Sequence, residues 1–175
     1  MKKIRRGLIV GRFQPYHLGH HHAVKNILRE VDELIIAIGS TEDSYKEKDP
    51  FTTGERVEMI SRALRADGIY EKCIIVPVPD VKEYALWTGR VRSYVPKFGI
   101  VYTNNPLVKE LFEAEGMPVR PMVSNNSRAE SAEVRKAMLN GGAWEKMVPA
   151  AVGGFLREIG AAERLKKILE EERKQ

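Results

Sequence analysis

The chain has 175 residues, of which 43% are hydrophobic and 30% are charged, and its formal net charge is +5. This length predicts a single domain, residues 1–175, that buries about 70% of its unfolded surface. The one cysteine, Cys73, excludes an intramolecular disulfide framework, and no apolar run is long enough to span a membrane. Acidic residues are interspersed with the basic ones, which suits a polyphosphate ligand better than a nucleic acid.

The first predicted element is a buried strand at residues 7–10, because Gly7-Leu-Ile-Val is an unbroken apolar run. The charged residues before it are not followed by the apolar core of a signal peptide, so we expect a cytoplasmic protein. A turn at residues 11–15 leads into helical apolar spacing from Leu18. His17 and His20 then lie at a helix start, where unpaired backbone N–H groups attract anions, and Arg12 precedes them. This stretch predicts a phosphate site.

Other interpretations of the histidines stay open. His21 and His22 are also explained as solvated residues in the first turns of a helix. A histidine cluster can bind a transition metal, but no Cys/His pair elsewhere closes a tetrahedral site, so we expect no metal held by the protein. The common Gly-rich phosphate fingerprints are missing, so any nucleotide binding is of another type.

Strands and helices alternate through the rest of the chain. Apolar runs predict four further strands, at residues 33–40, 73–79, 100–103 and, weakened by two prolines, 117–122. Helical spacing predicts helices at residues 52–67, 84–95, 105–115, 131–140 and 149–175. Residues 41–50 are expected to form a mobile polar loop near a ligand crevice. This pattern predicts a doubly wound parallel sheet, an α/β fold, with residues 149–175 as a helical C-terminal extension.

A family resemblance becomes visible in the first motif. Gly11-Arg-Phe-Gln-Pro15 followed by His17-Leu-Gly-His20 resembles the signature of the HxGH nucleotidyltransferase superfamily, and in particular of the archaeal nicotinamide-nucleotide adenylyltransferases. Pro50-Phe-Thr52, Gly54-Glu-Arg56, Ala85-Leu-Trp87 and Asn105-Pro-Leu-Val108 resemble further blocks of that family, in the same order. The resemblance covers nearly the whole chain.

The resemblance implies a Rossmann-like fold and an activity. Members of this family join ATP to nicotinamide mononucleotide (NMN), which gives NAD and pyrophosphate, with Mg²⁺ on the triphosphate. They are commonly hexamers, so a homo-oligomer is implied, with no nucleic-acid or membrane partner. The phosphate of the mononucleotide is already an anionic nucleophile, so the chemistry requires positioned donors rather than a catalytic base.

The resemblance also implies roles for individual residues. Catalytic contacts to the phosphates are implied for His17, His20, Arg12 and Arg135. Contacts to ATP are implied for Gly11, Phe13, Gln14, Gly19, Arg128 and Ser131. Contacts to NMN are implied for Gly39, Ser40, Asp80, Trp87 and Asn105.

Several of these residues have structural alternatives. Trp87 suits stacking on a pyridine ring, but an aromatic residue on a short helix also anchors a core. Asp80 and Asn105 are good capping residues without any ligand, and Trp144 is assigned to packing. The chain also departs from the family pattern at Tyr84, where a small amide is usual, and at Glu130-Ser-Ala132. We expect the carboxylate of Glu130 to lie near Arg135.

Two competing functions remain open. One is a related nucleotidyltransferase with another acceptor, such as flavin mononucleotide or phosphopantetheine, although Trp87 and Asn105-Pro106 disfavour it. The other is a nucleotide-binding module that has lost turnover. The sequence does not distinguish nicotinamide from nicotinate mononucleotide as the acceptor.

Overall fold

The computed structural model describes residues 4–123 and 130–174. Its centre is a five-stranded sheet in the order β3-β2-β1-β4-β5, in which every neighbouring pair is parallel. The strands are β1 (Arg6–Gly11), β2 (Glu33–Ile38), β3 (Cys73–Pro77), β4 (Ile100–Tyr102) and β5 (Val119–Arg120). The order reverses between β1 and β4, which is the point where ligands bind in open α/β sheets.

Helices connect these strands and continue beyond them. They are α1 (Leu18–Ile27), α2 (Thr53–Ala66), α3 (Trp87–Tyr94), α4 (Pro106–Ala114), α5 (Ser131–Leu139), α6 (Ala150–Glu158) and α7 (Ala161–Glu172). Short 3₁₀ turns at Tyr70–Lys72, Tyr84–Leu86 and Trp144–Met147 join some of them. The predicted C-terminal extension therefore consists of two helices, α6 and α7.

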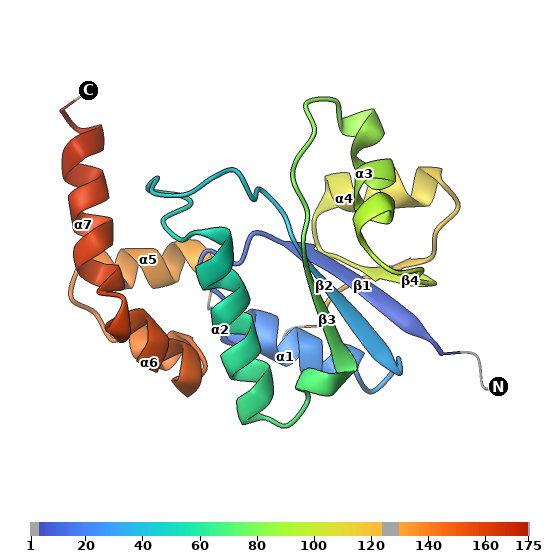
Figure 1. The fold of residues 1–175 in the computed structure, drawn as a ribbon, viewed down its shortest axis with the longest axis horizontal. Coiled ribbons are helices and arrows are strands. Elements are labelled where there is room, and N and C mark those ends of the chain that lie inside the picture. The colour runs from blue at the N-terminus through green and yellow to red at the C-terminus, as the bar shows by residue number, and fades with distance from the viewer. Residues whose placement is uncertain (1–3, 124–129, 175) are drawn as a thin grey trace.

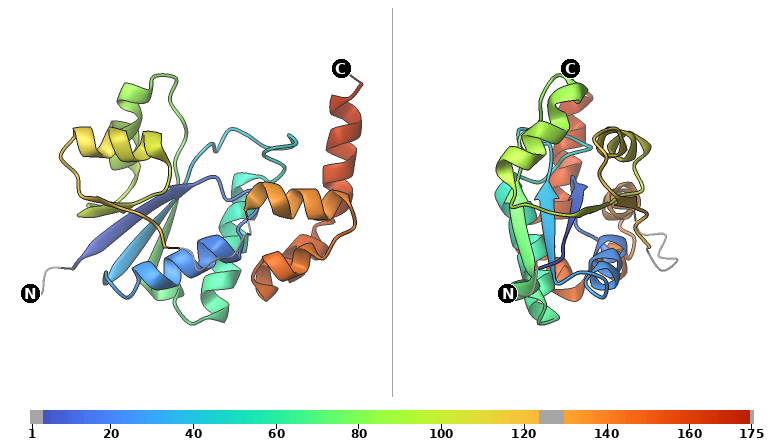
Figure 2. Two further views of the ribbon diagram at one scale, coloured as in Figure 1. Left: turned by 180° about the vertical axis from the view of Figure 1, so that it is seen from behind. Right: turned by 90° about the vertical axis from the view of Figure 1, so that its right-hand side faces the viewer.

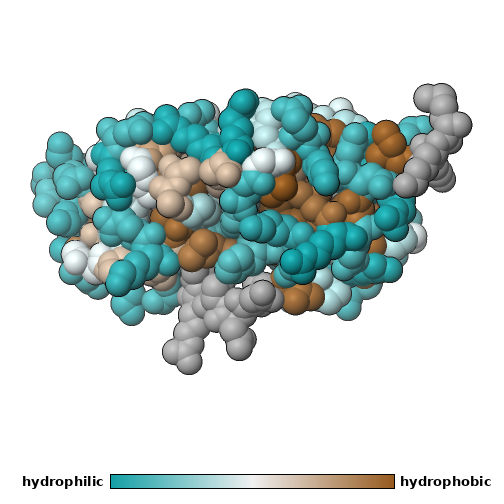
Figure 3. Space-filling view, turned by 90° about the horizontal axis from the view of Figure 1, so that it is seen from below, coloured by the Kyte–Doolittle hydropathy of each residue, from teal (hydrophilic) through white to brown (hydrophobic). Residues whose placement is uncertain are grey.

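Both faces of the sheet are covered, because successive side chains of a strand point to opposite sides. Ile36 and Ile38 of β2 pack with α1, α2 and the C-terminal helices, whereas Ile35 packs with α3 and α4. Figures 1 and 2 show these two layers of helices with the sheet between them. The face seen in Figure 3 is mostly hydrophilic, and its larger hydrophobic patch lies toward the N-terminal end of the molecule.

The predicted α/β fold with a doubly wound parallel sheet is confirmed. The predicted strand at residues 117–122 is much shorter, Val119–Arg120 at the sheet edge, as its flanking prolines require. Cys73 begins β3 and is half-buried, and burial raises the pKa of its thiol to about 12. Trp144 is buried in the core, as predicted. In the described part of the chain no helix is long and apolar enough to cross a membrane.

Candidate active site

A hollow opens at the carboxyl ends of β1, β2 and β4. Its volume is about 400 Å³, and it lies where the strand order reverses. All five residues predicted to contact NMN line it, together with Gly11 and Arg12 of the first motif. The lining comprises Val10, Gly11, Arg12, Gly39, Ser40, Asp80, Tyr84, Trp87, Asn105, Leu107, Val108 and Leu111. Residues separated by more than 90 positions in the sequence therefore meet in one place.

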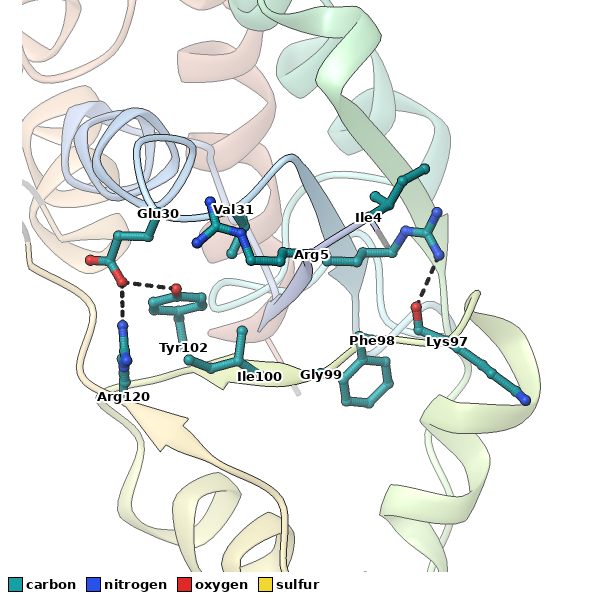
Figure 4. A pocket seen from close by; sticks show the side chains of 11 residues that line it. Ile4, Arg5, Glu30, Val31, Lys97, Phe98, Gly99, Ile100, Tyr102 and Arg120 are labelled. Carbon is teal, nitrogen blue, oxygen red and sulfur yellow. Dashed lines mark hydrogen bonds and ion pairs between the residues drawn. The ribbon is translucent and has the colours of Figure 1, made fainter. Parts of the chain in front are cut away.

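A larger hollow, of about 710 Å³, lies at the opposite end of the central strands, beside the amino ends of β1 and β4 (Figure 4). Several of its charged groups are engaged with other protein groups. Arg120 Nη1 is 2.7 Å from Glu30 Oε2, and Tyr102 donates a hydrogen bond to the same oxygen. Arg6 donates to the Lys97 carbonyl and also pairs with Glu33. What distinguishes the hollow at the carboxyl ends is its lining, which includes seven residues that the sequence predicts for the site: Gly11, Arg12, Gly39, Ser40, Asp80, Trp87 and Asn105.

His17 and His20 cap the first helix together. His17 is the N-cap residue of α1, and its Nδ1 accepts a hydrogen bond from Gly19 N at 3.1 Å. His20 reaches back, so that its Nδ1 accepts from His17 N at 3.3 Å. This is a capping box in which imidazoles replace the usual Ser/Thr and Glu. Because both Nδ1 atoms are acceptors, the proton of each neutral ring lies on Nε2, which is therefore a donor.

Burial keeps these two rings uncharged. It lowers the pKa of His17 to about 4. The pKa of His20 is lowered well below its ordinary value, chiefly by burial and further by repulsion from a charge on His17. The centroids of the two rings are 3.6 Å apart, with the ring planes tilted by 30°, and Phe13 packs edge-on against His20. At neutral pH the pair is thus a fixed set of neutral N–H donors.

The solvated interpretation is wrong for His21. This side chain is only 6% exposed, and its Nε2 lies 3.1 Å from Asp67 Oδ2. The hydroxyl oxygen of Tyr16, which is also buried, lies 3.2 Å from Nδ1 of His21. His21 therefore joins α1 to the end of α2 and faces away from the solvent. His22 is half-buried, with its Nδ1 shielded from solvent and without a hydrogen-bond partner in the described part of the chain.

The buried guanidinium of Arg56 fixes the two loops that carry the site. Arg56 is fully buried, and its Nη1 donates to the carbonyls of Arg12 at 2.9 Å and Gly39 at 2.8 Å. Its Nη2 donates to the Ser40 carbonyl at 3.0 Å. One side chain thereby ties the carboxyl ends of β1 and β2 to α2. Arg56 belongs to a block that resembles the family, but the sequence predicts no role for it.

The loop after β1 is held by close packing and by Gln14. A Cβ atom on Gly11 would lie 2.9 Å from the Phe13 ring, so this position requires glycine. Phe13 has φ of 53°, an uncommon conformation for a residue with a side chain, and its ring is buried. The Gln14 amide pairs with both the N–H and the carbonyl of Phe51, at 2.9 Å each. The side chains of Phe13 and Gln14 therefore shape the loop, and any contact of theirs with ATP would come from the backbone.

Two arginines and one buried carboxylate meet beside this loop. Arg12 Nη1 lies 3.4 Å from both oxygens of Asp49, which is 6% exposed. Arg135 Nη1 donates to the Gln14 carbonyl at 2.7 Å, and Ser131 Oγ donates to the Pro15 carbonyl at 3.0 Å. The first turns of α5 are thus docked on the first motif, as the predicted role of Arg135 requires.

The surroundings of Arg135 differ from the expectation in one respect. Burial lowers the pKa of Arg135, and the carboxylates whose charges act on it are those of Asp49 and Glu47. Glu130 instead lies exposed at the N-cap of α5. Asp49 is a residue that sequence reasoning missed, because only the fold brings residue 49 beside residue 12. Arg128 lies outside the described residues.

The acceptor side of the hollow combines caps with an aromatic face. The Asn105 Oδ1 accepts from Leu107 N and Val108 N at the start of α4, so its capping role is confirmed. Ser40 Oγ donates to Asp80 Oδ2 at 2.8 Å. Trp87 packs edge-on against Phe112, so its packing role is confirmed, and it also lines the hollow, where stacking on a pyridine ring stays a prediction. Tyr84 stands beside it and is 65% exposed.

The parallel sheet and its convergent donors define a Rossmann-like nucleotidyltransferase fold. The cytidylyltransferase-like family matches residues 8–137. Nicotinamide-nucleotide adenylyltransferase of Archaeoglobus fulgidus is 48% identical over 168 residues, 93% of this chain and 97% of that protein. The same-named protein of Methanocorpusculum labreanum is 48% identical over 94% of this chain and 98% of its own length. The chain therefore belongs to the nicotinamide-nucleotide adenylyltransferases within the cytidylyltransferase-like family.

Solved structures show the same fold at lower identity. A bifunctional NMN adenylyltransferase/ADP ribose pyrophosphatase from Francisella tularensis superposes with a TM-score of 0.82 at 19% identity. This similarity covers 98% of the present chain and 54% of that longer protein. The same protein complexed with AMP and a manganese ion superposes with a TM-score of 0.79 at 20% identity.

The first prediction concerns acid stability. The folded-state pKa of His17, about 4, lies below the ordinary 6.5, so between these pH values the unfolded chain binds more protons. The free energy of unfolding should fall as pH drops from 6.5 to 4, by up to about 3 kcal/mol from this residue. His17→Asn keeps a capping oxygen, but its side chain does not titrate in this range. Urea unfolding at pH 7 and pH 4 should therefore show a smaller loss of unfolding free energy in this variant than in the wild type. An equal loss in both proteins would contradict this assignment.

The second prediction concerns Arg56. Arg56→Met leaves the carbonyls of Arg12, Gly39 and Ser40 without their donor, and should lower the free energy of unfolding by roughly 3 kcal/mol or more. Arg65→Met, a change at an exposed arginine of the same helix, should cost less than about 1 kcal/mol. Urea unfolding of both variants makes the comparison. Similar losses in the two would show that the buried contacts contribute little.

Proposed function

We propose that this protein transfers the adenylyl group of ATP to the phosphate of NMN, giving NAD and pyrophosphate. The observation that carries the proposal is the pair of neutral histidine donors at the start of α1, which follows the loop of Gly11 and Arg12. That loop lines a hollow that also holds the aromatic ring of Trp87. The identity to proteins named nicotinamide-nucleotide adenylyltransferase supports it. The acceptor ring would stack on Trp87, with Ser40, Asp80 and the Nδ2 group of Asn105 beside it.

The residues of the site serve positioning and charge stabilisation. The NMN phosphate attacks the α-phosphorus of ATP in line, the new P–O bond forms as the bond to pyrophosphate breaks, and no proton need be removed from the nucleophile. Nε2–H groups of His17 and His20 donate to the phosphates as charge gathers there. Arg12 and Arg135 neutralise the triphosphate, for which the guanidinium fork is suited. When ATP is bound, the Arg12 guanidinium must therefore leave Asp49 and contact the phosphates.

A divalent cation would enter on the triphosphate. Among residues 4–123 and 130–174, no three His, Cys, Asp or Glu side chains come together as a metal site requires. We propose that this cation is Mg²⁺ and that phosphate oxygens would hold most of it. Asp49 is the buried carboxylate at this end of the site that could assist them. The cation would add to the charge neutralisation that the arginines supply.

A panel of acceptors tests the proposed function. The protein is incubated with ATP and Mg²⁺ plus NMN, nicotinate mononucleotide, flavin mononucleotide or phosphopantetheine, and dinucleotide products and pyrophosphate are measured. NAD and pyrophosphate should form in equal amounts. Product with flavin mononucleotide or phosphopantetheine alone would show another acceptor, and no product with any acceptor would show a binding module.

The third prediction separates the catalytic role of His20 from its capping role. His20→Gln places at N3 a residue that completes capping boxes, so the fold should be kept. It removes the fixed Nε2–H donor, and kcat should fall by roughly a hundredfold or more. Circular dichroism and steady-state kinetics measure the two effects. A folded variant with wild-type kcat would remove His20 from the mechanism.

The fourth prediction concerns Trp87. Trp87→Leu keeps an apolar contact to Phe112 but removes the aromatic face, so KM for NMN should rise by roughly two- to tenfold, the worth of an aromatic stack. KM for ATP should stay nearly unchanged. A Trp144→Phe background makes Trp87 the only tryptophan, and its fluorescence should respond to NMN. If the substrate constants are unchanged, Trp87 serves packing alone.

Assembly and location stay predictions. We expect a homo-oligomer, commonly a hexamer in the family that the sequence resembles. Its mass in sedimentation analysis should be well above the 19.8 kDa of one chain. A monomer in sedimentation analysis would overturn this expectation.

A further inference from the structure

The C-terminal helix α7 contacts the loop between β2 and α2. Arg164 Nη1 of α7 lies 2.7 Å from Glu55 Oε2, and the side chains are only 19% and 17% exposed. The same guanidinium lies over the Tyr45 ring, 5.2 Å from its centroid. Near the end of α7, Glu172 Oε1 accepts a hydrogen bond from Glu47 N at 3.0 Å. Figure 1 shows this loop extending from the sheet toward α7.

Glu55 connects this contact to the start of α2. Its Oε2 also accepts a hydrogen bond from Thr52 N at 2.9 Å, while Thr52 Oγ1 accepts from Glu55 N, so the two residues form a capping box. Arg164 and Thr52 thus share one carboxylate oxygen. A charged donor to that oxygen holds the carboxylate in the capping position, although burial by itself opposes its charge.

The start of α2 is joined directly to the loop that carries Arg12. Phe51, next to Thr52, is paired through its backbone with Gln14. Arg56, next to Glu55, donates to the Arg12 carbonyl. Asp49, at the other end of the same short segment, lies 3.4 Å from the Arg12 guanidinium. Any shift of this segment therefore moves both the backbone of Arg12 and the carboxylate that its guanidinium faces.

We propose that Arg164 is a positioning residue for the ATP end of the site. It clamps Glu55 and Tyr45, and so sets where the loop of residues 41–50 and Arg12 lie before the triphosphate binds. This inference rests on the proposed function, because it assigns ATP to that end. It gives the C-terminal helices a role in the reaction although α7 itself contributes no residue to the hollow.

The chain offers a matched control for this arginine. Arg62 also links α2 to the C-terminal helices, with its Nη1 2.9 Å from Glu158 Oε1 of α6. Its guanidinium also lies over an aromatic ring, that of Phe155, 4.7 Å from the centroid. Arg62 lies seven positions after Glu55 on the same helix, but its contacts are with Glu58, Glu158 and Phe155 rather than with the capping box or the loop of residues 41–50. It therefore has the same kind of contacts as Arg164 but not the connection to Arg12.

The test compares full-length Arg164→Ala, Arg164→Lys and Arg62→Ala with the wild type. Kd for Mg-ATP is measured by calorimetry without an acceptor, and KM and kcat are measured with NMN. Arg164→Ala should raise both Kd and KM for ATP by roughly tenfold to a hundredfold, the effect of weakening one charge-assisted hydrogen bond from Arg12 to the triphosphate. Its KM for NMN should stay within about twofold. Arg164→Lys keeps the charge beside Glu55 and should be intermediate, whereas Arg62→Ala should bind ATP as the wild type does.

The inference is overturned if Arg164→Ala loses stability but keeps the wild-type Kd for Mg-ATP, or if Arg62→Ala weakens ATP binding equally. Should Arg164→Ala fail to fold, Tyr45→Leu carries the test, because Tyr45 is 58% exposed and this change leaves the ion pair. Weaker ATP binding then supports the inference and an unchanged Kd overturns it. If the wild type binds Mg-ATP but forms no NAD, the proposed function fails while the Kd comparison still decides this inference.

Discussion

The buried guanidinium of Arg56 is the interaction on which the geometry of the site depends. Parallel strands end in loops whose carbonyl groups have no partner in the sheet, and burying such groups unpaired is costly. Arg56 supplies donors to three of them, at the ends of β1 and β2, without facing a substrate itself. The two loops are thereby fixed relative to α2, and the left-handed backbone of Phe13 and Ser40 is stabilised within them.

Within this frame, the backbone of α1 determines the chemistry of the two histidines. A helix start needs acceptors for its free N–H groups, and here the Nδ1 atoms of His17 and His20 provide them. The same hydrogen bonds place the remaining proton of each ring on Nε2. Burial then favours the neutral forms, as the lowered pKa values show. In the proposed reaction the pair donates to phosphate oxygens, while Arg12 and Arg135 supply the positive charge. Capping and substrate contact would then be two uses of one ring.

The sequence predicts the fold and the convergence of the site well, because these follow from local patterns. Apolar runs, proline positions and capping residues indicate the strands and helices, and parallel strands bring their carboxyl ends together. The family blocks indicate His17, Arg135 and Trp87. What the sequence does not indicate depends on contacts between distant residues. Asp49 meets Arg12 because β1 and β2 are neighbours in the sheet, and Arg164 meets Glu55 because the C-terminal helices fold back. Nor does the sequence indicate the burial of His21, because its partner Asp67 lies 46 residues away.

We propose that the two histidines donate hydrogen bonds to the phosphates and do not attack phosphorus. With Nδ1 occupied by a backbone N–H and a proton on Nε2, neither ring has a free lone pair to act as a nucleophile. The most direct test is the stereochemical course of the reaction at the α-phosphorus. ATP carrying sulfur in place of one α-oxygen, as a single diastereomer, is converted with NMN, and the configuration of the thio-dinucleotide is read by phosphorus NMR. A single in-line displacement predicts inversion. Retention would show two displacements through an adenylylated residue and would contradict the account.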